Sequence, residues 1–420
     1  MPGLMLGIDL CDDYSQISYF NTQVMDAASV GITDEENSCL IPSVVCKQRG
    51  KDAWFIGEEA YVCALRGEGT MVDKPIKMLS KSGTATIEGV KYTAENIIEI
   101  LLEKMLEVAK GKIGEQTIDS LVVTIQDKDA TVIDALIGVT DRMGIRREAV
   151  HVINHAEAFL FYVLSQKKEI WANQTCLFDL TAHGLHYYEM SVVRGRNPQV
   201  VKVVHESLEE GFSLEILDST SGGKLADRIL YACAERQLNK KLITTAFLTG
   251  KGFEKTDWAP SFLKMLCNKR RVFSGQNLFA RGAAFLAYDF LQETSAYPYV
   301  FLCEGRVPAT VSMKVQHEGR ERQLIVVPAG SNWYEAKATV DFILDDTHSV
   351  DFTVTPIQLG AQKRYSVSLD EFPARPNKTT RVQVVVSFIS DNKMTVRVID
   401  KGFGEFFPAS GQMVRQDFTI

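Results

Sequence analysis

The sequence predicts a mixed α/β protein built from two related lobes and followed by an all-β domain. Leu4 to Phe20 and Cys176 to Val193 each read as strand, tight turn and strand, and each carries Asp-Leu at its turn. Strand and helix patterns alternate after these hairpins, as in α/β lobes. Past Pro298 the sequence changes to dense, alternating Val, Thr, Phe and Ile. These three observations define the expected fold class.

The segment after the first hairpin predicts two short strands and two helices. Ile41 to Lys47 and Ala53 to Ile56 flank a turn that contains glycine, and a helix is expected to start at Gly57. Thr93 is an N-cap candidate for a helix from Ala94 to Lys110, because apolar residues recur there every three or four positions. This stripe indicates a helix with one face in the core.

The next elements continue the alternation of an α/β lobe. The pattern predicts a buried strand at Ser120 to Ile125, a helix from Ala130 to Met143 that ends at Gly144, a strand at Val150 to Ile153 and a helix at Ala156 to Leu164. The second hairpin then begins the same order again.

The last third of the chain reads as strands alone. Alternating runs such as Thr339 to Leu344 and Arg381 to Val386 are separated by turn residues, which is typical of an all-β domain. We place the boundary near Glu293 to Pro298, where Thr, Ser, Ala and Pro interrupt a helix. The chain of 420 residues is thus divided into 1–172, 173–295 and 299–420, in keeping with the usual size of domains.

Composition and charge restrict the class of partner. A hydrophobic content of 45% and a charged content of 24% are those of an ordinary folded protein. The net charge of −7 argues against nucleic acid as the main partner, because phosphate binding needs a concentrated basic surface. The eight cysteines form no Cys-x-x-Cys pair, and the sequence shows no signal peptide and no apolar run that would cross a bilayer. We expect a cytoplasmic protein with reduced thiols and no membrane partner.

Asp9 and Asp179 are the first candidate site residues. Each follows an apolar strand at the turn of its hairpin, where a carboxylate can hold a magnesium ion and its waters in front of a phosphate chain. The alternative is that each aspartate only caps its turn by accepting backbone N–H groups. His183 and His186 lie close in sequence, but without Cys or a carboxylate at ligand spacing we interpret them as ordinary hairpin positions.

Seven short motifs follow one another along nearly the whole chain. They are Gly7 to Phe20, Pro42 to Val45 with Gly57 to Ala60, Ile153 to Ala158, Asp179-Leu180, Gly222-Gly223 followed by Asp227, Leu248 to Gly252, and Arg281 to Ala284. In this order they resemble the phosphate loops, adenosine loop and closing helix of the seventy-kilodalton heat-shock chaperones. The chain resembles a divergent, bacterial-type member of that family within the actin, sugar-kinase and heat-shock ATPase superfamily.

The resemblance implies a two-lobed, actin-like ATPase fold with ribonuclease-H-like lobes, followed by a β-sandwich similar to the substrate-binding domain of the chaperones. It implies a reduced second lobe, because only 25 residues separate Gly223 from Thr249 where the chaperones fold a subdomain that clamps adenosine. ATP or ADP with magnesium would be the ligand. A peptide or protein would be the partner of the sandwich.

The family's functional positions can be carried over residue by residue. The resemblance implies nucleotide binding by Asp9, Asp12, Asp179, Gly184, Gly222, Gly223, Gly250 and Gly252. It implies vestigial catalytic positions at Asp9, Lys77, His155 and Asp179, with Asp9 and Asp179 as the magnesium ligands.

The residues that differ from the family's motifs are those that would bind phosphate and magnesium. Cys11, Asp12 and Asp13 stand where the family has Gly-Thr-Thr, although a turn that cradles phosphate needs glycine and is repelled by added carboxylates. The segment Thr181 to Gly184 keeps one glycine of the second loop, and His155 replaces the glutamate that positions magnesium and water. The phosphate loops are therefore degenerate.

Aromatic residues in the β-domain are candidates for partner binding. They are Trp333, Tyr334, Phe403, Phe406 and Phe407, the last three in a glycine-containing run. Such rings either form an exposed apolar patch that receives a partner or fill the edge of the sandwich.

The resemblance and its degenerate phosphate loops therefore imply a chaperone-like pseudo-ATPase, non-catalytic or barely catalytic, that serves as a peptide- or protein-binding module or scaffold. Two alternatives remain open. One is a slow, magnesium-dependent ATP hydrolase coupled to substrate binding by the β-domain, and the other is an actin-like assembly subunit. The fold alone does not choose among them.

Overall fold

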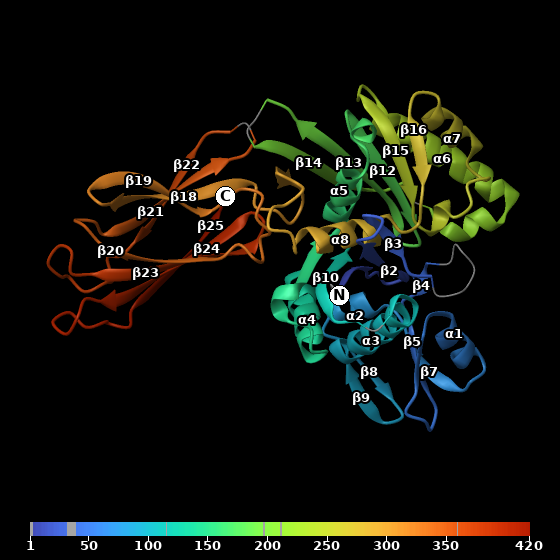
Figure 1. The fold of residues 1–420 in the computed structure, drawn as a ribbon, viewed down its shortest axis with the longest axis horizontal. Helices are drawn as coiled ribbons and strands as arrows, with labels where there is room; N and C mark the ends of the chain where they lie inside the picture. The colour runs from blue at the N-terminus through green and yellow to red at the C-terminus, as the bar shows by residue number, and fades with distance from the viewer. Residues whose placement is uncertain (1–2, 32–38, 115, 196–197, 211, 359) are drawn as a thin grey trace. The chain divides into compact units, whose positions relative to one another are not determined.

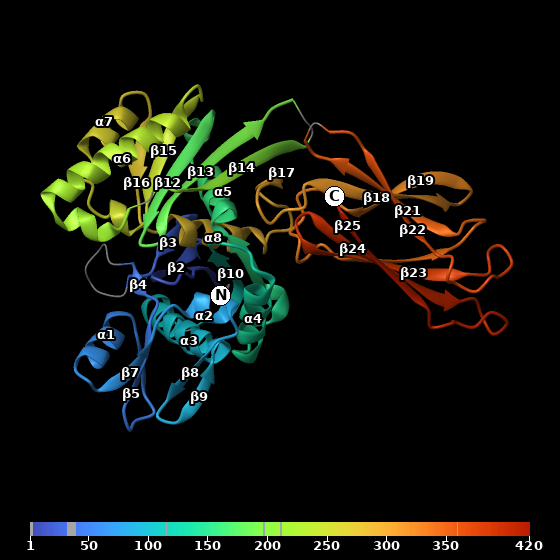
Figure 2. The ribbon, with the colours of Figure 1, turned by 180° about the vertical axis from the view of Figure 1, so that it is seen from behind.

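The computed structural model describes residues 3–31, 39–114, 116–195, 198–210, 212–358 and 360–420 (Figures 1 and 2). The chain forms two compact units. The first comprises Met1–Val193 and Lys202–Pro298, and the second comprises Arg194–Val201 and Tyr299–Ile420.

The first sheet of the first unit has the strand order β11-β10-β1-β2-β3, with β4 also paired to β2. Its strands are β1 (Leu4–Asp9), β2 (Tyr14–Asn21), β3 (Asp26–Ser29), β4 (Ile41–Pro42), β10 (Ile118–Ile125) and β11 (Val150–Asn154). β1, β10 and β11 are mutually parallel, and β1 and β2 form the antiparallel hairpin that the sequence predicts. Because parallel strands end at one edge, the residues that follow β1 and β11 meet there.

The second sheet of this unit repeats the same order as β16-β15-β12-β13-β14. Its strands are β12 (Gln174–Thr181), β13 (Gly184–Val193), β14 (Gln199–Leu208), β15 (Ile243–Thr249) and β16 (Arg271–Ser274). β12 forms a hairpin with β13 and runs parallel to β15, which runs parallel to β16. The second predicted hairpin is therefore confirmed. In both sheets the first strand of the hairpin pairs with a parallel strand, which in turn pairs with a second parallel strand.

Eight α-helices lie in the described part of the first unit. They are α1 (Gly57–Leu65), α2 (Pro75–Ser80), α3 (Ala94–Ile113), α4 (Ala130–Arg142), α5 (His155–Ser165), α6 (Thr220–Leu238), α7 (Pro260–Cys267) and α8 (Leu278–Asp289). The predicted cap at Thr93 is confirmed, because its hydroxyl accepts from the Asn96 N–H at the start of α3. α3 ends three residues beyond the predicted Lys110.

Five short strands lie outside the two main sheets. β5 (Val45–Gln48), β6 (Trp54–Ile56) and β7 (Gly69–Val72) form one small sheet, and β8 (Thr84–Ile87) pairs with β9 (Val90–Thr93). The sequence pattern predicts the strands at β5 and β6. It does not predict β7, β8 or β9.

Helix α8 packs against β1 and α5 at the centre of the first unit (Figures 1 and 2). A Cβ atom added at Gly282 of α8 would lie 1.9 Å from the carbonyl oxygen of Ala158 in α5. One added at Gly7 of β1 would lie 2.2 Å from the carbonyl oxygen of Ala280. Both contacts are to backbone, which cannot turn aside as a flexible side chain does. The position of α8 therefore requires glycine at both places.

The second unit contains two four-stranded antiparallel sheets, in the orders β19-β18-β21-β22 and β20-β23-β24-β25. The strands of these sheets are β18 (Ala309–His317), β19 (Arg320–Val327), β20 (Ala338–Ile343), β21 (Ser349–Pro356), β22 (Lys363–Ser368), β23 (Arg381–Ser390), β24 (Lys393–Gly402) and β25 (Met413–Thr419), and β17 (Tyr299–Leu302) lies outside both. Alternate residues of β21 are buried, as the period of two requires. The expected all-β character of the C-terminal part is confirmed. Among the described helices, none combines the length and apolar character needed to span a bilayer.

Replacing Gly282 with alanine tests the α5–α8 crossing. We expect Gly282→Ala to lower the free energy of unfolding by about 1–3 kcal/mol, because the added methyl group forces two backbones apart. Gly138→Ala is the matched control, since the nearest atom to a Cβ there is the flexible Arg142 side chain at 3.9 Å. This control should stabilise by up to about 1 kcal/mol through helix propensity. Urea denaturation measures both, and equal effects of the two substitutions would contradict a tight crossing.

Candidate functional site

Three polar side chains meet at the edge of the first sheet where β1 and β11 end. Asp9 is the last residue of β1, Cys11 follows in the turn, and His155 is the first residue of α5, directly after β11. The Nε2 atom of His155 lies 2.8 Å from Oδ1 of Asp9. The Cys11 sulfur lies 3.5 Å from the same Oδ1 and 3.6 Å from Nε2. We call these three residues the Asp-Cys-His cluster.

His155 is held in place from two sides. Its imidazole ring pairs with Asp9 and stacks on the ring of Phe279 in α8, with centroids 3.9 Å apart and planes 10° from parallel. Burial lowers the pKa of His155, but the charge of Asp9 and the hydrogen bond to it outweigh this effect, and the pKa is raised. A raised pKa favours the imidazolium, so the pair has the character of a buried ion pair.

Cys11 is a protonated thiol in this arrangement. The residue is partly exposed, while its sulfur is surrounded by protein. This burial, together with the charges of Asp9 and Asp13, raises the pKa of the thiol well above its usual value. A thiol in such surroundings is a poor nucleophile, because the reactive form of cysteine is the thiolate.

Asp179 lies two residues before the end of β12 and pairs with Thr249 of β15, as Asp9 of β1 pairs with Thr124 of β10. Its side chain is buried, and burial raises its pKa to about 7, although the charge of His155 opposes the shift. Gly250, with a φ of 90°, passes so close that an added Cβ would lie 2.5 Å from the Asp179 Oδ1. In the hairpin Asp179 stands opposite His186, whose pKa burial lowers to about 4. Asp179 therefore keeps its proton to near-neutral pH.

The arrangement brings together donors that suit a metal ion. One ligand atom each from Asp9, Cys11 and His155 lies within 4.8 Å of the other two, among the residues that the structure describes. From the sequence, Asp9 and Asp179 are expected to be magnesium ligands, and Cys11 and His155 are departures from a phosphate site. The geometry instead groups Asp9 with these two residues.

Asp12 and Lys77 do not join the Asp-Cys-His cluster through their side chains. The Asp12 carboxylate accepts the backbone N–H groups of Ile76 and Lys77, at 2.8 and 3.0 Å, and so caps the start of α2. The side chain of Lys77 is exposed. Asp12 is thus a capping residue whose carboxylate binds backbone N–H groups.

The glycines predicted to bind nucleotide lie in turns and in close backbone packing of the second sheet and its helices. Gly184 closes the hairpin turn with a φ of 139°. A Cβ added at Gly222 would lie 2.0 Å from the carbonyl oxygen of Ile216. One added at Gly223 would lie 3.3 Å from the Trp258 side chain, and one added at Gly252 would lie 2.4 Å from the Leu180 side chain. Packing accounts for glycine at these helix and turn positions.

Two residues beside the site, Phe279 and Tyr188, are not predicted from the sequence. Phe279 stacks on His155, and Tyr188 of β13 is fully buried with its ring 5.9 Å from that of Phe279. Both lie in ordinary apolar patterns of a helix and a strand, so no local signal distinguishes them from core residues.

The predicted partner-binding aromatic residues separate into two groups. Trp333 is buried and Tyr334 is partly buried, so Trp333 packs in the interior of the second unit. Phe406, by contrast, is 92% exposed and Phe403 is 43% exposed. Phe403 and Phe407 pair through their backbones across the turn that carries Phe406.

A buried ion pair fixes this turn, which we call the Phe406 loop (residues 402–408). Both guanidinium NH groups of Arg375 donate to the carboxylate of Asp400 at 2.8 Å, and Asp400 also accepts the N–H groups of Gly402 and Ser410. Burial alone would raise the pKa of Asp400, but Arg375 and these hydrogen bonds outweigh it and hold the pKa far below its usual value. Asp400 therefore stays ionised.

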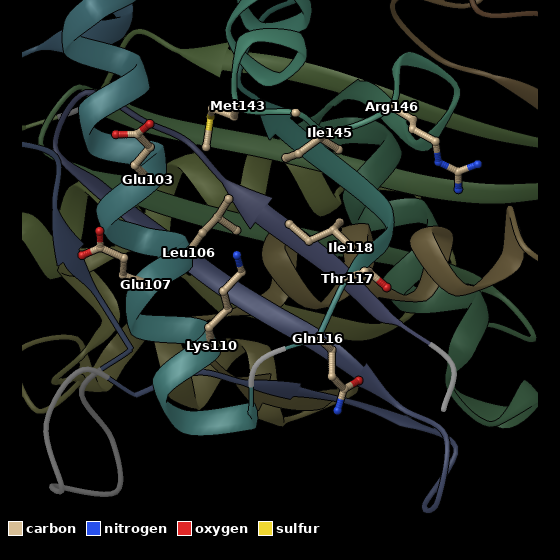
Figure 3. Close-up of a pocket in the computed structure, with 11 residues that line it drawn as sticks. Glu103, Leu106, Glu107, Lys110, Gln116, Thr117, Ile118, Met143, Ile145 and Arg146 are labelled. Atoms are coloured by element: carbon tan, nitrogen blue, oxygen red, sulfur yellow. The ribbon is translucent and has the colours of Figure 1, made fainter.

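A hollow of about 640 Å³ lies elsewhere, between α3, the start of β10 and the end of α4 (Figure 3). Charged side chains of α3, including Glu103, Glu107 and Lys110, line one side, and Met143, Ile145 and Arg146 lie across from them. None of the site residues predicted from the sequence lines this hollow.

Asp179→Asn tests the buried, protonated carboxyl group. The folded protein holds the Asp179 proton to about pH 7, whereas the unfolded chain loses it near pH 4, so the wild type loses stability between these values as pH rises. The variant cannot ionise there. We expect its stability relative to the wild type to increase from pH 4 to pH 7, by a few kcal/mol, and then to level off.

Urea denaturation at several pH values, in buffer with a chelator, measures this difference. Asp134→Asn is the control, because Asp134 is exposed on α4, and its difference from the wild type should not change with pH. A difference for Asp179→Asn that is independent of pH would contradict the raised pKa.

Two family models match the chain, and no curated protein does. Residues 306–420 match a domain of unknown function, DUF8552. Residues 26–304 match a model described as the C-terminal part of a family of unknown function, DUF5716. Because that match spans more than half of the chain, the chain belongs to the DUF5716 C-terminal family.

Proposed function

We propose that the first unit is a two-lobed, actin-like fold whose nucleotide cleft does not hydrolyse ATP, and that the protein is a chaperone-like binding module or scaffold. The fold part of this proposal draws support from the two sheets, which share one strand order and each begin with a hairpin that carries an aspartate. The ordered motifs that resemble the heat-shock chaperones support it further.

The pairing of Asp9 with His155 carries the functional part of the proposal. A magnesium-dependent ATPase of this type needs an accessible carboxylate at the end of β1 to hold the hydrated ion. Here Asp9 is 5% exposed, and its Oδ1 is already bound to the imidazole of His155 at 2.8 Å. Phe279 stacks on that imidazole, and a magnesium ion would have to break this buried pair without gaining the imidazole nitrogen as a ligand, because magnesium takes oxygen ligands.

The neighbouring residues do not fit a magnesium-bound triphosphate. A phosphate loop offers backbone N–H groups without a Cβ in the way, whereas Cys11, Asp12 and Asp13 carry side chains and two of them carry negative charge. Asp12 is bound to the start of α2. The turn therefore repels the ligand that it would have to hold, and we assign no catalytic step to it.

The Phe406 loop is the feature of the second unit that suits a partner. A phenylalanine ring that is 92% exposed costs free energy in water and gains it when a peptide or protein covers it. The Arg375–Asp400 pair holds the backbone of the loop, which limits the entropy lost on binding. An apolar peptide segment is the partner that this surface fits.

Calorimetric titration with nucleotide tests the proposed loss of ATPase function. We expect nucleotide-stripped protein to give no binding heat with ATP or ADP, with or without magnesium, because Asp9 is already paired and the turn after β1 carries carboxylates. Thermal-shift measurements under the same conditions should show no change in Tm.

Magnesium-dependent binding at micromolar concentration would overturn the proposal and favour the slow ATPase. In that case Asp9→Asn and Asp179→Asn should each abolish turnover. Nucleotide-dependent sedimentation of the full chain would favour the actin-like assembly subunit instead.

Phe406→Ser tests the role of the Phe406 loop. With a fluorescent, permanently unfolded model protein as the probe, we expect the substitution to raise Kd at least tenfold, because an exposed ring would be the main apolar contact. Ile325→Ser is the matched control, since Ile325 on β19 is also exposed, at 59%, and should leave Kd unchanged. Fluorescence anisotropy measures the Kd of both variants. Equal Kd values for Phe406→Ser and the wild type would contradict a role of the Phe406 loop in partner binding.

A further inference from the structure

The Asp-Cys-His cluster has the ligand types of a transition-metal site. A thiol, an imidazole and a carboxylate are the groups that bind zinc in proteins, whereas magnesium takes oxygen ligands alone. Asp9 and Cys11 are two residues apart in the turn after β1, and His155 comes from the parallel strand β11 and the start of α5. The fold therefore assembles these donors from segments that are distant in sequence.

The distances between the donor atoms agree with a tetrahedral ion. Ligand atoms at about 2.0–2.3 Å from zinc lie about 3.3–3.6 Å from one another. The sulfur of Cys11 lies 3.5 Å from Oδ1 of Asp9 and 3.6 Å from Nε2 of His155. The third distance, 2.8 Å between Nε2 and Oδ1, is shorter because a proton joins those two atoms. Only this separation has to widen, by about half an ångström.

We propose that Asp9, Cys11 and His155 bind one divalent transition-metal ion, with zinc as the best match, and that a water molecule completes the coordination. The ion replaces the hydrogen bond between His155 and Asp9. Cys11 loses its thiol proton to solvent, and the imidazolium of His155 loses the proton on Nε2. No electron is transferred, and the ion with its thiolate and carboxylate ligands forms a neutral group.

Unpartnered polar atoms beside the cluster are an independent observation in favour of a ligand. Thr124 stands opposite Asp9 in the parallel register of β1 and β10, so the two side chains share a face of the sheet. Its buried hydroxyl has no hydrogen-bond partner in the described part of the chain, and the same holds for the Nδ1 atom of His155. Unpaired buried groups are costly, and a water bound to the metal beside Nε2 provides a partner for the Thr124 hydroxyl. The Nδ1 atom lies on the other side of the imidazole ring, out of reach of that water.

Tyr188 adds a third unpartnered group. Its hydroxyl is buried and has no partner among the described residues. The Tyr188 ring lies 5.9 Å from that of Phe279, which stacks on His155. The surroundings of the cluster are thus polar as well as buried.

Cys11 is the member of the cluster that lies nearest to solvent. Asp9 and His155 are buried, and Cys11 is partly exposed as a residue although its sulfur is surrounded by protein. An ion that arrives from solvent would therefore reach the cluster past the turn that carries Cys11. This inference goes beyond the proposed function, because it requires neither a nucleotide nor a partner.

Titration with cobalt and zinc tests the site. We expect the full chain, stripped of metal by a chelator, to bind one Co²⁺ and to develop a thiolate-to-cobalt charge-transfer absorption. Zn²⁺ should displace the cobalt, while millimolar Mg²⁺ should not. Calorimetry of Zn²⁺ binding in buffers of different ionisation enthalpy should show the release of one to two protons per ion.

Variants identify the ligands. Cys11→Ser should abolish the charge-transfer band and weaken Zn²⁺ binding at least tenfold, and His155→Gln should weaken it similarly. Cys267→Ser is the matched control, because Cys267 is an exposed thiol at the end of α7, and it should bind like the wild type. Circular dichroism of the metal-free variants establishes that they are folded, and Zn²⁺ should raise the Tm of the wild type but not of Cys11→Ser.

Three outcomes would overturn the proposal. They are the absence of both Zn²⁺ binding and a charge-transfer band in the wild type, unchanged binding by folded Cys11→Ser, and displacement of cobalt by Mg²⁺. None of them bears on the nucleotide titration, since that experiment uses no transition metal. The two proposals can therefore fail separately.

Discussion

The close crossing of α5 and α8 is the constraint on which the first unit depends. Gly282 lets α8 approach the backbone of Ala158, and one turn earlier in each helix Phe279 stacks on His155. Since His155 is the first residue of α5, the crossing that packs two helices also fixes the imidazole against Asp9. The packing of the core and the geometry of the candidate site are therefore set by one contact.

The electrostatics of the site follow from this burial. Asp9 and His155 share charge across a short hydrogen bond, Cys11 remains a thiol, and Asp179 keeps its proton to about pH 7. A buried group of this kind is stable only when its charges are paired or neutralised. The Asp9–His155 pair without metal and the coordination of a transition metal both satisfy that requirement, whereas a triphosphate would add negative charge to the site.

The second unit also contains a buried ion pair, which here positions an exposed apolar residue. The buried Arg375–Asp400 pair holds the backbone of the Phe406 loop, while the ring of Phe406 remains in solvent. Two parallel hydrogen bonds from Arg375 and the N–H groups of Gly402 and Ser410 satisfy the carboxylate, so its desolvation is compensated. An ion pair in the interior thus keeps an apolar residue in position at the surface.

The sequence by itself determined the local elements: the two hairpins with Asp9 and Asp179 at their turns, the Thr93 cap of α3, and the all-β C-terminal part. Periodicity, caps and turns are properties of neighbouring residues, so they can be read locally. The tertiary structure alone decided that Cys11 and His155 join Asp9 and that Phe279 stacks on His155. It also decided that Asp12 caps α2, and that Trp333 is buried while Phe406 is exposed. Those outcomes depend on contacts between residues far apart in the chain, which strand pairing and helix packing create and which no local pattern contains.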